Sequence, residues 1–201
     1  MVQTQLRARG IDDERVLAAM EVVPRELFVP EGLRADAYED AALPIGFDQT
    51  ISQPYMVARI CAELQLRGYE RVLDVGTGSG YQAAVLAELA DEVHSIEIIP
   101  ALAERARAAL AAAGYAARVH LHVGDGAHGL PEHAPFHAIA VAAAAAEPPA
   151  PLLEQTFRGG RLAIPIGPPG RQLLRIYVAT PEGAADFAAV PCRFVPLVSS
   201  G

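Results

Sequence analysis

Residues 71–82 read Arg-Val-Leu-Asp-Val-Gly-Thr-Gly-Ser-Gly-Tyr-Gln, which predicts a buried strand, a glycine turn and the start of a helix. Val72, Leu73 and Val75 form the short apolar run that is typical of a strand in a parallel sheet. Three glycines in five residues let the chain turn sharply and leave space for a ligand against the backbone. A helix that begins near Tyr81 would direct its first amides at that ligand. The combination predicts a site for a nucleotide-type cofactor.

The spacing of the glycines distinguishes between possible cofactors. Dinucleotide-binding proteins carry G-x-G-x-x-G, whereas this chain carries G-x-G-x-G with Asp74 two residues before the first glycine. A carboxylate beside the turn would repel a pyrophosphate. It suits S-adenosylmethionine, which has an ammonium group, a sulfonium and no phosphate. We therefore expect S-adenosylmethionine as the cofactor, and not NAD.

Two further acidic residues follow the next two predicted strands. Glu97 closes the strand expected over 92–96, where a carboxylate can accept hydrogen bonds from both ribose hydroxyls. Asp125 follows the strand expected over 119–123, in the sequence Val-Gly-Asp-Gly. Together with Asp74, they would define one rim of the cofactor site. Each acid could instead be a turn or capping residue, because Asp and Gly favour turns in any case. Taken with the glycine turn, the set favours the cofactor site.

Composition bounds the class of protein. A chain of 201 residues predicts one domain. The net charge is −8, all 16 basic residues are Arg, and no basic cluster favours a nucleic acid. The sequence has no 18-residue apolar run for a membrane span, and its first residues have no apolar core of a signal peptide. Cys61 and Cys192 lie far apart without a CxxC motif, which predicts two buried free thiols in a reducing cytoplasm.

The periodicity predicts alternating strands and helices after an N-terminal helical region. Helices are expected over 2–9, 12–20 (with Asp12 as N-cap), 54–64, 80–89, 100–113 and 152–157. Strands are expected over 71–75, 92–96, 119–123, 136–141 and 161–166, followed by antiparallel strands over 173–180 and 190–197. The segment 42–53 is expected to be a loop. This order of elements predicts an α/β fold with a mostly parallel sheet.

A second and more specific motif precedes the first of these strands. Residues 43–57 read Leu-Pro-Ile-Gly-Phe-Asp-Gln-Thr-Ile-Ser-Gln-Pro-Tyr-Met-Val, and this segment resembles the protein-L-isoaspartate (D-aspartate) O-methyltransferase family. Residues 23–29 (Val-Pro-Arg-Glu-Leu-Phe-Val), 159–167 (Gly-Gly-Arg-Leu-Ala-Ile-Pro-Ile-Gly) and 193–197 (Arg-Phe-Val-Pro-Leu) are similar to the same family. The likeness runs from about Leu6 to Leu197, whereas the glycine turn alone would indicate only a class I methyltransferase.

The resemblance implies a Rossmann-like class I methyltransferase, with helices on both faces of the sheet, an N-terminal helical extension and antiparallel C-terminal strands. It divides the single domain into N-terminal helices and an active-site loop (1–66), a cofactor-binding core (67–167) and C-terminal strands (168–201). The implied reaction moves a methyl group from S-adenosylmethionine to the α-carboxylate of an isoaspartyl residue. The ester then collapses to a succinimide, which reopens partly to aspartate. Damaged proteins and peptides are the expected partners, and a cytoplasmic monomer the expected form.

The resemblance also assigns site residues. Ser52 matches the active-site serine of the family's Thr-Ile-Ser motif. The expected cofactor-binding residues are Thr50, Ile51, Asp74, Gly76, Thr77, Gly78, Ser79, Gly80, Glu97, Asp125 and Gly126. The expected substrate-binding residues are Gln53, Val195, Pro196 and Leu197. A carboxylate nucleophile is already ionised at neutral pH, so the reaction needs no general base and no metal.

Two of these assignments have structural alternatives, and the chain departs from the family pattern at two places. Ser52 could merely cap the helix that begins at Pro54. Residues 195–197 could form an ordinary edge strand. Asp48 stands where the family usually has Gly, and its carboxylate either disfavours an anionic substrate or points to solvent. The alanine tract at 142–146 stands where the family commonly has Thr or Gly, then Ala-Ala and often Pro.

Other polar residues indicate no further site. His120 and His122 alternate along one predicted strand and share a face, but two ligands do not make a metal site and no third ligand has convincing spacing. The remaining histidines, at 94, 128, 133 and 137, are scattered, so we expect no metal. Arg105 and Arg107 with Glu104 read as a solvated helix face.

Other functions remain compatible with the same cofactor site. One is an aspartate or small-molecule O-methyltransferase, which would differ near Asp48 and in the last strands. Another is a non-catalytic module that binds S-adenosylmethionine. A nucleic-acid methyltransferase is disfavoured by the acidic charge and the absence of an Asn/Asp-Pro-Pro-Tyr segment, and a dehydrogenase by the glycine spacing.

Overall fold

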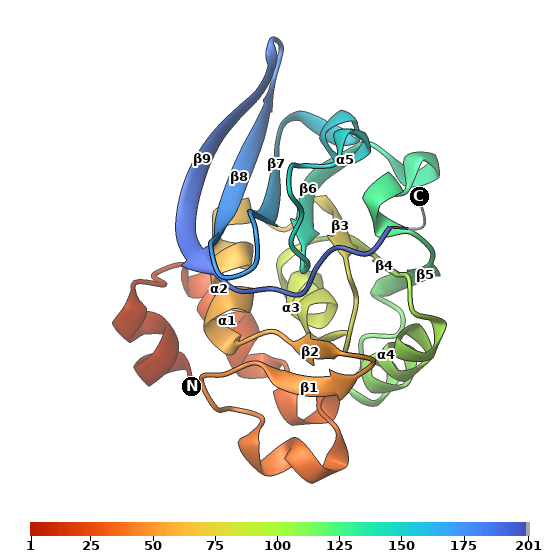
Figure 1. Ribbon diagram of the computed structural model, residues 1–201. Helices are drawn as coiled ribbons and strands as arrows, with labels where there is room; N and C mark the ends of the chain where they lie inside the picture. Colours follow the sequence, from red (N-terminus) through yellow and green to blue (C-terminus); the bar gives the residue numbers. More distant parts are fainter. Residues whose placement is uncertain (200–201) are drawn as a thin grey trace.

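A seven-stranded sheet forms the centre of the protein in the computed structural model, which describes residues 1–199 (Figure 1). The strands lie in the order β5-β4-β3-β6-β7-β8-β9. Their bounds are β3 (Arg71–Val75), β4 (Glu92–Glu97), β5 (Val119–Val123), β6 (Phe136–Val141), β7 (Thr156–Ile166), β8 (Gln172–Thr180) and β9 (Gly183–Cys192). The strands from β5 to β7 pair in parallel, and β8 and β9 pair antiparallel. The Rossmann-like prediction is therefore confirmed.

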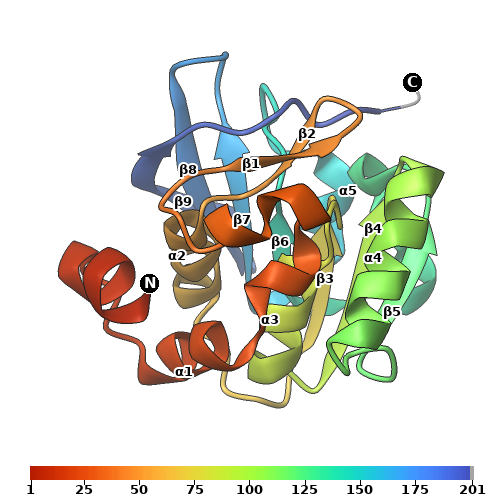
Figure 2. The ribbon, with the colours of Figure 1, turned by 90° about the horizontal axis from the view of Figure 1, so that it is seen from below.

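Helices cover both faces of this sheet (Figure 2). One face carries α2 (Pro54–Leu64), α3 (Tyr81–Leu89) and α4 (Pro100–Ala112), and α1 (Glu14–Val22) packs on α2 and α3. The other face carries the short α5 (Ala150–Glu154), whose Leu152 is fully buried among side chains of β3, β4 and β6. The helix α3 is buried on nearly all sides, as expected for a helix whose residues are almost all apolar.

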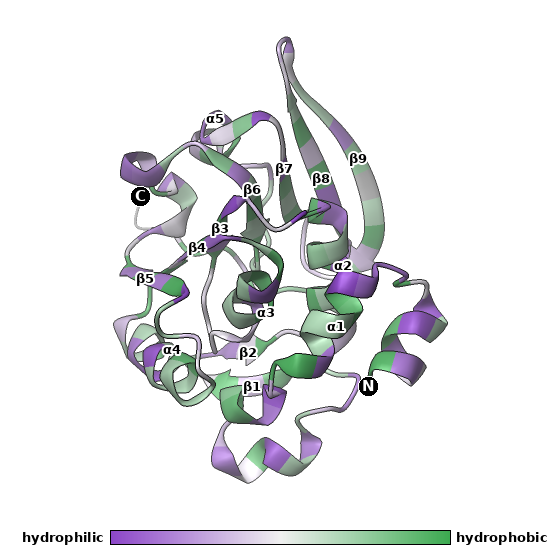
Figure 3. Cartoon of the chain, turned by 180° about the vertical axis from the view of Figure 1, so that it is seen from behind, coloured by the Kyte–Doolittle hydropathy of each residue, from purple (hydrophilic) through white to green (hydrophobic). Residues whose placement is uncertain are grey.

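The N-terminal region is a layer of short helices outside α2 and α3. It contains a π-helical turn (Val2–Leu6) and 3-10 helices at Arg7–Arg9, Arg25–Phe28 and Glu31–Asp36. Hydrophilic residues concentrate on these outer turns, whereas α1 and α3 are predominantly hydrophobic (Figure 3). The predicted N-cap of α1 is wrong by one residue: Asp13, not Asp12, accepts hydrogen bonds from the amides of Arg15 (2.9 Å) and Val16 (3.2 Å).

The segment 42–53, which was expected to be a loop, contains a β-hairpin. Strands β1 (Leu43–Gly46) and β2 (Gln49–Ile51) pair antiparallel and form a separate small sheet. Phe47 and Asp48 make the turn, with φ angles of 55° and 56°. Two successive left-handed residues are the signature of a type I′ hairpin turn, which usually has Asn-Gly. Phe-Asp hides that signature in the sequence, although Asp tolerates the left-handed region better than most residues.

The C-terminal strands also differ from the prediction. The helix expected over 152–157 ends at Glu154, and β7 begins at Thr156, before the glycine pair at 159–160. The last strand is Gly183–Cys192 and not 190–197. Its first seven residues, Gly-Ala-Ala-Asp-Phe-Ala-Ala, have little β-propensity, and the pairing to β8 at the edge of the sheet makes the segment a strand.

Residues 194–198 form an extended segment that crosses the carboxyl end of β6 (Figure 1). The amide of Ala144 donates to the carbonyl of Val195, and the amide of Leu197 donates to the carbonyl of Ala144, both at 2.8 Å. Both cysteines are free thiols, but only Cys61 is buried: Cys192, at the end of the edge strand β9, is half-buried, so its predicted burial is wrong. Among residues 1–199, no helix has both the length and the apolar character that crossing a membrane requires.

Candidate active site

The order of the strands opens a crevice at the carboxyl end of β3. The chain runs from β3 outward through β4 to β5 and then returns to β6 on the other side of β3. At such a switch point the connections after the two central strands diverge, and ligands bind between them. A cleft lies here, lined by residues 50–52 and 76–79, by Glu97 and Gly126, and by residues 195–197. Most of the predicted cofactor and substrate residues therefore meet in one place.

The glycine turn has the backbone conformation that its sequence predicts. Gly76, Gly78 and Gly80 have φ angles of 88°, 53° and 89°, values that residues other than glycine rarely adopt. Gly76 and Gly78 line the cleft, but Gly80 does not. A Cβ on Gly80 would lie 3.3 Å from Leu110 Cγ, so this glycine serves the close packing of α3 on α4. Its predicted contact with the cofactor stays a prediction.

Glu97 is fixed at the end of β4 with its carboxylate at the cleft. Its Oε2 accepts a hydrogen bond from the amide of Gly78 (2.8 Å), and its Oε1 accepts one from the amide of Ile99 (2.9 Å). The residue is 5% exposed. Each oxygen keeps a further lone pair, so the carboxylate can accept two more hydrogen bonds from neighbouring hydroxyl groups.

Asp74 does not reach the cleft, which corrects its predicted contact with the cofactor. Its side chain is fully buried, and its carboxylate accepts hydrogen bonds from Gln82 Nε2 and Ser95 Oγ, both at 2.8 Å. Burial raises the pKa of Asp74 to about 6, although the hydrogen bonds from Gln82 and Ser95 oppose this rise. Ser95 Oγ also lies 2.5 Å from Thr77 Oγ1. Asp74 therefore orients Gln82 and Thr77, which do line the cleft.

Asp125 is a capping residue. Its Oδ1 accepts from the amide of Ala127 (2.9 Å), so that Asp125 is the N-cap of a short 3-10 helix (Gly126–His128). Its Oδ2 accepts from the hydroxyl of Ser199 (2.8 Å). Asp125 does not line the cleft, whereas its neighbour Gly126 does. Of the three acids that were expected on the rim, Glu97 lines the cleft, and Asp74 and Asp125 do not.

Ser52 lies where the first cleft meets a second one. The second cleft is lined on one side by Gln53, Tyr55 and Met56 and on the other by residues 191–195. Ser52 lines both clefts, as do Thr50, Ala142 and Val195. The capping alternative for Ser52 is wrong, because Gln53 is the N-cap residue of α2 and that helix has no side-chain cap. Gln53 lines only the second cleft, and its side-chain Nε2 donates to the Asp40 carboxylate at 2.8 Å.

Arg25, which was not among the predicted site residues, supports the backbone of Ser52. Its side chain is fully buried. Its Nε donates to the carbonyl of Ala37 (2.7 Å), and its Nη2 donates to the carbonyl of Ser52 (2.8 Å). The guanidinium lies over the ring of Tyr81, 4.7 Å from the centroid. Burial lowers the pKa of Arg25 to about 10, so the group is charged at neutral pH. The only sequence signal was its place in the Val-Pro-Arg segment.

The two departures from the family pattern lie in different surroundings. Asp48 is exposed at the tip of the β1–β2 hairpin and lines neither cleft. Its φ angle of 56° explains why glycine also suits this position. Ala142 and Ala143 line the first cleft, and Ala144 pairs with residues 195–197. The small side chains of the alanine tract allow this close approach of the C-terminal segment.

Two expectations about charged and polar residues are corrected. Arg105 does not only face solvent: its Nη1 donates to the carbonyl of Ile45 (3.2 Å) and its guanidinium lies over the Phe47 ring, so it braces the hairpin. The spacing in the sequence indicated no third ligand for His120 and His122, and the other histidines were described as scattered. His94 and His133 lie beside His122, because sheet pairing and a distant turn bring them together.

The comparisons with known proteins agree with this geometry. The matching family model is described as protein-L-isoaspartate(D-aspartate) O-methyltransferase (PCMT), and it covers residues 1–201. A protein-L-isoaspartate O-methyltransferase 2 of Anaeromyxobacter sp. (strain Fw109-5) is 55% identical over 202 residues, covering 100% of this chain and 83% of that protein. A protein-L-isoaspartate O-methyltransferase of Methanoculleus marisnigri is 52% identical over 201 residues, covering 98% of this chain and 90% of that protein.

Solved structures are similar over nearly the whole chain. One from Plasmodium falciparum, described as a beta-aspartate methyltransferase (PCMT) in complex with S-adenosyl-L-homocysteine, has a TM-score of 0.84 at 25% identity and covers 98% of this chain and 96% of that one. Another, described as protein-L-isoaspartate O-methyltransferase, has a TM-score of 0.87 at 27% identity and covers 99% of this chain and 66% of that one. With relatives more than half identical from end to end, this chain belongs to the protein-L-isoaspartate (D-aspartate) O-methyltransferase family.

Proposed function

We propose that the protein transfers a methyl group from S-adenosylmethionine to the α-carboxylate of L-isoaspartyl residues in damaged proteins and peptides. The observation that carries this proposal is the meeting of two clefts at Ser52. One cleft has the features of a cofactor site, and the other is open to an extended peptide. The relatives that span the chain are named for this reaction.

The first cleft suits S-adenosylmethionine by its charge. Glu97 contributes a carboxylate, and within the described residues the lining includes no Arg or His side chain. A site of this kind attracts an ammonium or sulfonium group and offers a phosphate no positively charged side chain. Glu97 would accept hydrogen bonds from the two ribose hydroxyls, and the turn at 76–79 would lie against the cofactor. The S-adenosyl-L-homocysteine in the Plasmodium falciparum structure supports S-adenosylmethionine as the cofactor.

The chemical step asks little of the protein beyond alignment. S-adenosylmethionine supplies a methyl group on a sulfonium, which is electrophilic without further activation. The isoaspartyl carboxylate is ionised at neutral pH and needs no general base. The Ser52 hydroxyl, which shows no hydrogen bond within residues 1–199, would donate to this carboxylate and hold it in line. Alignment of two reacting groups can lower a barrier by about 7–11 kcal/mol.

The C-terminal segment would hold the peptide around the isoaspartyl residue. Ala144 already occupies the carbonyl of Val195 and the amide of Leu197. The carbonyl of Pro196 points to the opposite side of this extended segment, since successive backbone groups alternate. We expect a substrate amide to bond there. Gln53, in the second cleft, would contact the peptide on the other side of its isoaspartyl residue.

These contacts suggest a separate role for each of the three parts of the single domain. Residues 1–66 would supply Ser52 and its support, residues 67–167 the cofactor site, and residues 168–201 the peptide segment. One chain contributes to both clefts, which fits an active monomer. The two free thiols fit a reducing compartment such as the cytoplasm.

Methyl transfer to a matched pair of peptides tests the function. The peptides are identical except for one isoaspartyl or one normal aspartyl residue, and the methyl group of S-adenosylmethionine is labelled. We expect label on the isoaspartyl peptide alone. Label on both peptides would favour a general aspartate O-methyltransferase. Label on neither, with S-adenosylmethionine bound in calorimetry, would contradict the proposed acceptor and favour a small-molecule substrate or a non-catalytic module.

A further inference from the structure

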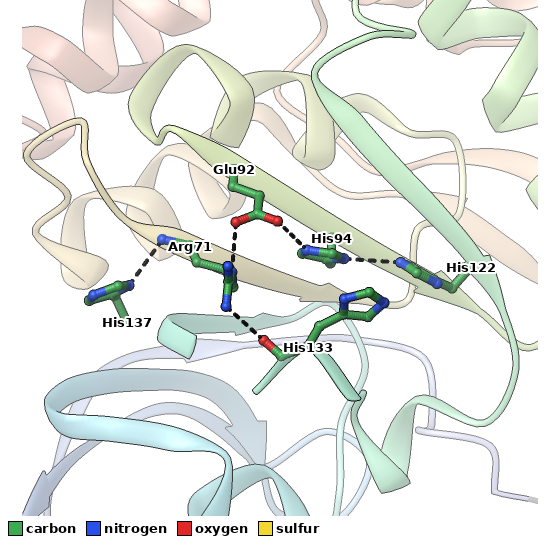
Figure 4. A network of polar contacts seen from close by, with 6 residues as sticks. All are labelled: Arg71, Glu92, His94, His122, His133 and His137. Atoms are coloured by element: carbon green, nitrogen blue, oxygen red, sulfur yellow. Dashed lines mark hydrogen bonds and ion pairs between the residues drawn. The ribbon is translucent and has the colours of Figure 1, made fainter. Parts of the chain in front are cut away.

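Three histidines that are distant in sequence form a cluster away from both clefts. His94 lies on β4, His122 on β5, and His133 in a 3-10 helix (Pro131–His133) that leads to β6 (Figure 4). One ring nitrogen from each lies within 4.8 Å of the others. The ring centroid of His133 lies 4.2 Å from that of His94 and 5.1 Å from that of His122. None of the three lines the proposed cofactor or peptide cleft.

The hydrogen bond between Glu92 and His94 sets the protonation of the His94 ring. Glu92 Oε1 lies 2.9 Å from His94 Nε2. A carboxylate can only accept, so the proton of a neutral His94 ring is on Nε2. His94 Nδ1 then carries a lone pair, and it lies 3.1 Å from His122 Nε2. His122 Nε2 must therefore donate its proton to His94 Nδ1. A carboxylate that fixes one imidazole nitrogen while the other is free to bind a metal is the usual arrangement behind histidine ligands.

Arg71 holds both the carboxylate and the third histidine. Its Nε donates to Glu92 Oε2 (2.6 Å), and its Nη1 donates to the carbonyl of His133 (3.2 Å). Its own backbone amide donates to His137 Nδ1 (3.1 Å). Figure 4 shows this chain of contacts, which joins β3 and β4 to the turn that carries His133. The orientation of the cluster is thus determined by residues that lie outside it.

We propose that His94 Nδ1, His122 Nε2 and one nitrogen of His133 bind a divalent transition-metal ion, with zinc as the ion and water as its fourth ligand. Zinc–nitrogen bonds of about 2.0–2.1 Å in a tetrahedron place the nitrogens roughly 3.4 Å apart, close to the separation between His94 and His122. The ion takes the place of the proton that lies between His94 and His122. That proton moves from Nε2 to Nδ1 of the His122 ring, which stays neutral and binds the ion through Nε2. Imidazole nitrogens suit zinc and do not suit magnesium or calcium.

The ion would link β4 and β5 to the turn before β6. His94 is 3% exposed, and its ring contacts His133 and also Phe136, which belongs to the core on the sheet face that carries α5. Because metal binding requires the folded site, zinc would stabilise this face of the sheet. We expect it to raise the melting temperature without changing methyl transfer, since the clefts lie elsewhere.

Metal binding by the full chain, without a polyhistidine tag and after chelator treatment, tests the proposal. We expect one equivalent of zinc to bind with a Kd near 1 µM or tighter, measured by competition with a chromophoric chelator. Cobalt(II) in the same site should show the intense visible absorption of a tetrahedral complex. His133→Gln should weaken zinc binding at least 100-fold, and Glu92→Gln by about 10- to 100-fold. His128→Gln changes an exposed histidine outside the cluster and should leave zinc binding unchanged.

Two results would overturn the metal site. One is a Kd weaker than about 100 µM in the wild-type chain, and the other is unchanged zinc affinity in the His133→Gln variant. Calorimetric binding of S-adenosylmethionine confirms that each variant is folded. If His133→Gln does not fold, His122→Gln replaces it in the same measurement.

Discussion

Ser52 combines a fixed backbone with an available side chain. Its carbonyl accepts a hydrogen bond from Arg25, and its side chain lines both clefts. We predict that Ser52→Ala lowers the kcat of methyl transfer by roughly 10- to 100-fold, because the carboxylate loses a donor that aligns it. The Kd of S-adenosylmethionine should stay within about twofold, since the residues around the cofactor are unchanged. Steady-state kinetics and calorimetry measure the two quantities, and an unchanged kcat would remove Ser52 from the reaction.

Asp74 predicts a pH dependence of stability. Its pKa in the folded chain is about 6, raised mainly by burial, and lies above the unfolded value near 3.9. The folded chain therefore binds this proton more tightly, and the stability that it contributes is lost as the pH rises from about 4 through 6. In Asp74→Asn this contribution is absent. Between pH 4.5 and 7.5, wild type should lose roughly 2 kcal/mol of unfolding free energy relative to the variant. Denaturant unfolding at both pH values measures this, and parallel pH profiles would contradict it.

Single residues show where sequence reasoning reached its limit. Glu97 and Asp74 both stand near strand ends, so the sequence predicts the same cofactor-binding role for both. Side chains alternate along a strand, and the packing of α3 decides which carboxylate reaches the cleft and which one bonds to Gln82. Arg25 could not be identified for a similar reason. Its partners are the backbone carbonyls of Ala37 and Ser52. Every residue has such a carbonyl, so the sequence does not indicate which ones accept a hydrogen bond from Arg25.

At the scale of elements, the layer of 3-10 helices positions the loop that carries Ser52. Arg25 connects the two through its bidentate guanidinium. We predict that Arg25→Lys lowers kcat about tenfold and the unfolding free energy by about 1–3 kcal/mol, since an ammonium cannot reach both carbonyls and one remains unsatisfied. The Kd of S-adenosylmethionine should change little. Arg34→Lys, at an exposed position of the same layer, is the matched control. Equal kinetics for both variants would show that Arg25 has no positioning role.

The position of Asp48 in the β1–β2 hairpin predicts that replacing it leaves catalysis unchanged. Its backbone is left-handed and its side chain is exposed outside both clefts. Asp48→Gly should raise the unfolding free energy by roughly 0.5 kcal/mol, because glycine adopts this conformation without strain but loses more entropy on folding. The kcat and KM for an isoaspartyl peptide should stay within about twofold. A large change in KM would place the Asp48 carboxylate near the substrate.

Elements with a strong local pattern were predicted, and those that depend on distant partners were not. The strands β3, β5 and β6 and the helix α2 lie within a residue of their expected bounds. The hairpin was missed because Phe-Asp is an unusual pair for its turn, and β9 was misplaced because pairing with β8, not its composition, makes it a strand.

For the molecule as a whole, cofactor binding should appear as thermal stabilisation. A ligand at about 100 times its Kd stabilises the folded state by about 2.7 kcal/mol. For a chain of this size that corresponds to a rise in Tm of roughly 5–10 °C. We predict this rise with S-adenosylmethionine and none with NAD, because the cleft lining has a carboxylate and no basic group for a pyrophosphate. Differential scanning fluorimetry at matched ligand concentrations checks it, and a comparable rise with NAD would contradict the cofactor assignment.

The architecture of the whole chain was the most predictable level. The glycine turn and the order of strands and helices indicate the parallel sheet, and the sheet order then determines where the crevice opens. The sequence could not show that residues 194–198 return across the end of β6, since only tertiary contacts with Ala144 place them there. The histidine cluster depends in the same way on strands that pair far from one another along the chain.

The contact between the two clefts at Ser52 makes the protein a target for bivalent ligands. A compound that joins an adenosyl group to a short peptide needs only a brief linker, because the clefts share the residues at their junction. Once one half is bound, a short linker holds the other half at an effective concentration in the millimolar range, and the combined affinity can exceed either half by about 10²–10⁴. Such a compound would report the distance between cofactor and acceptor directly, through the linker length that binds best.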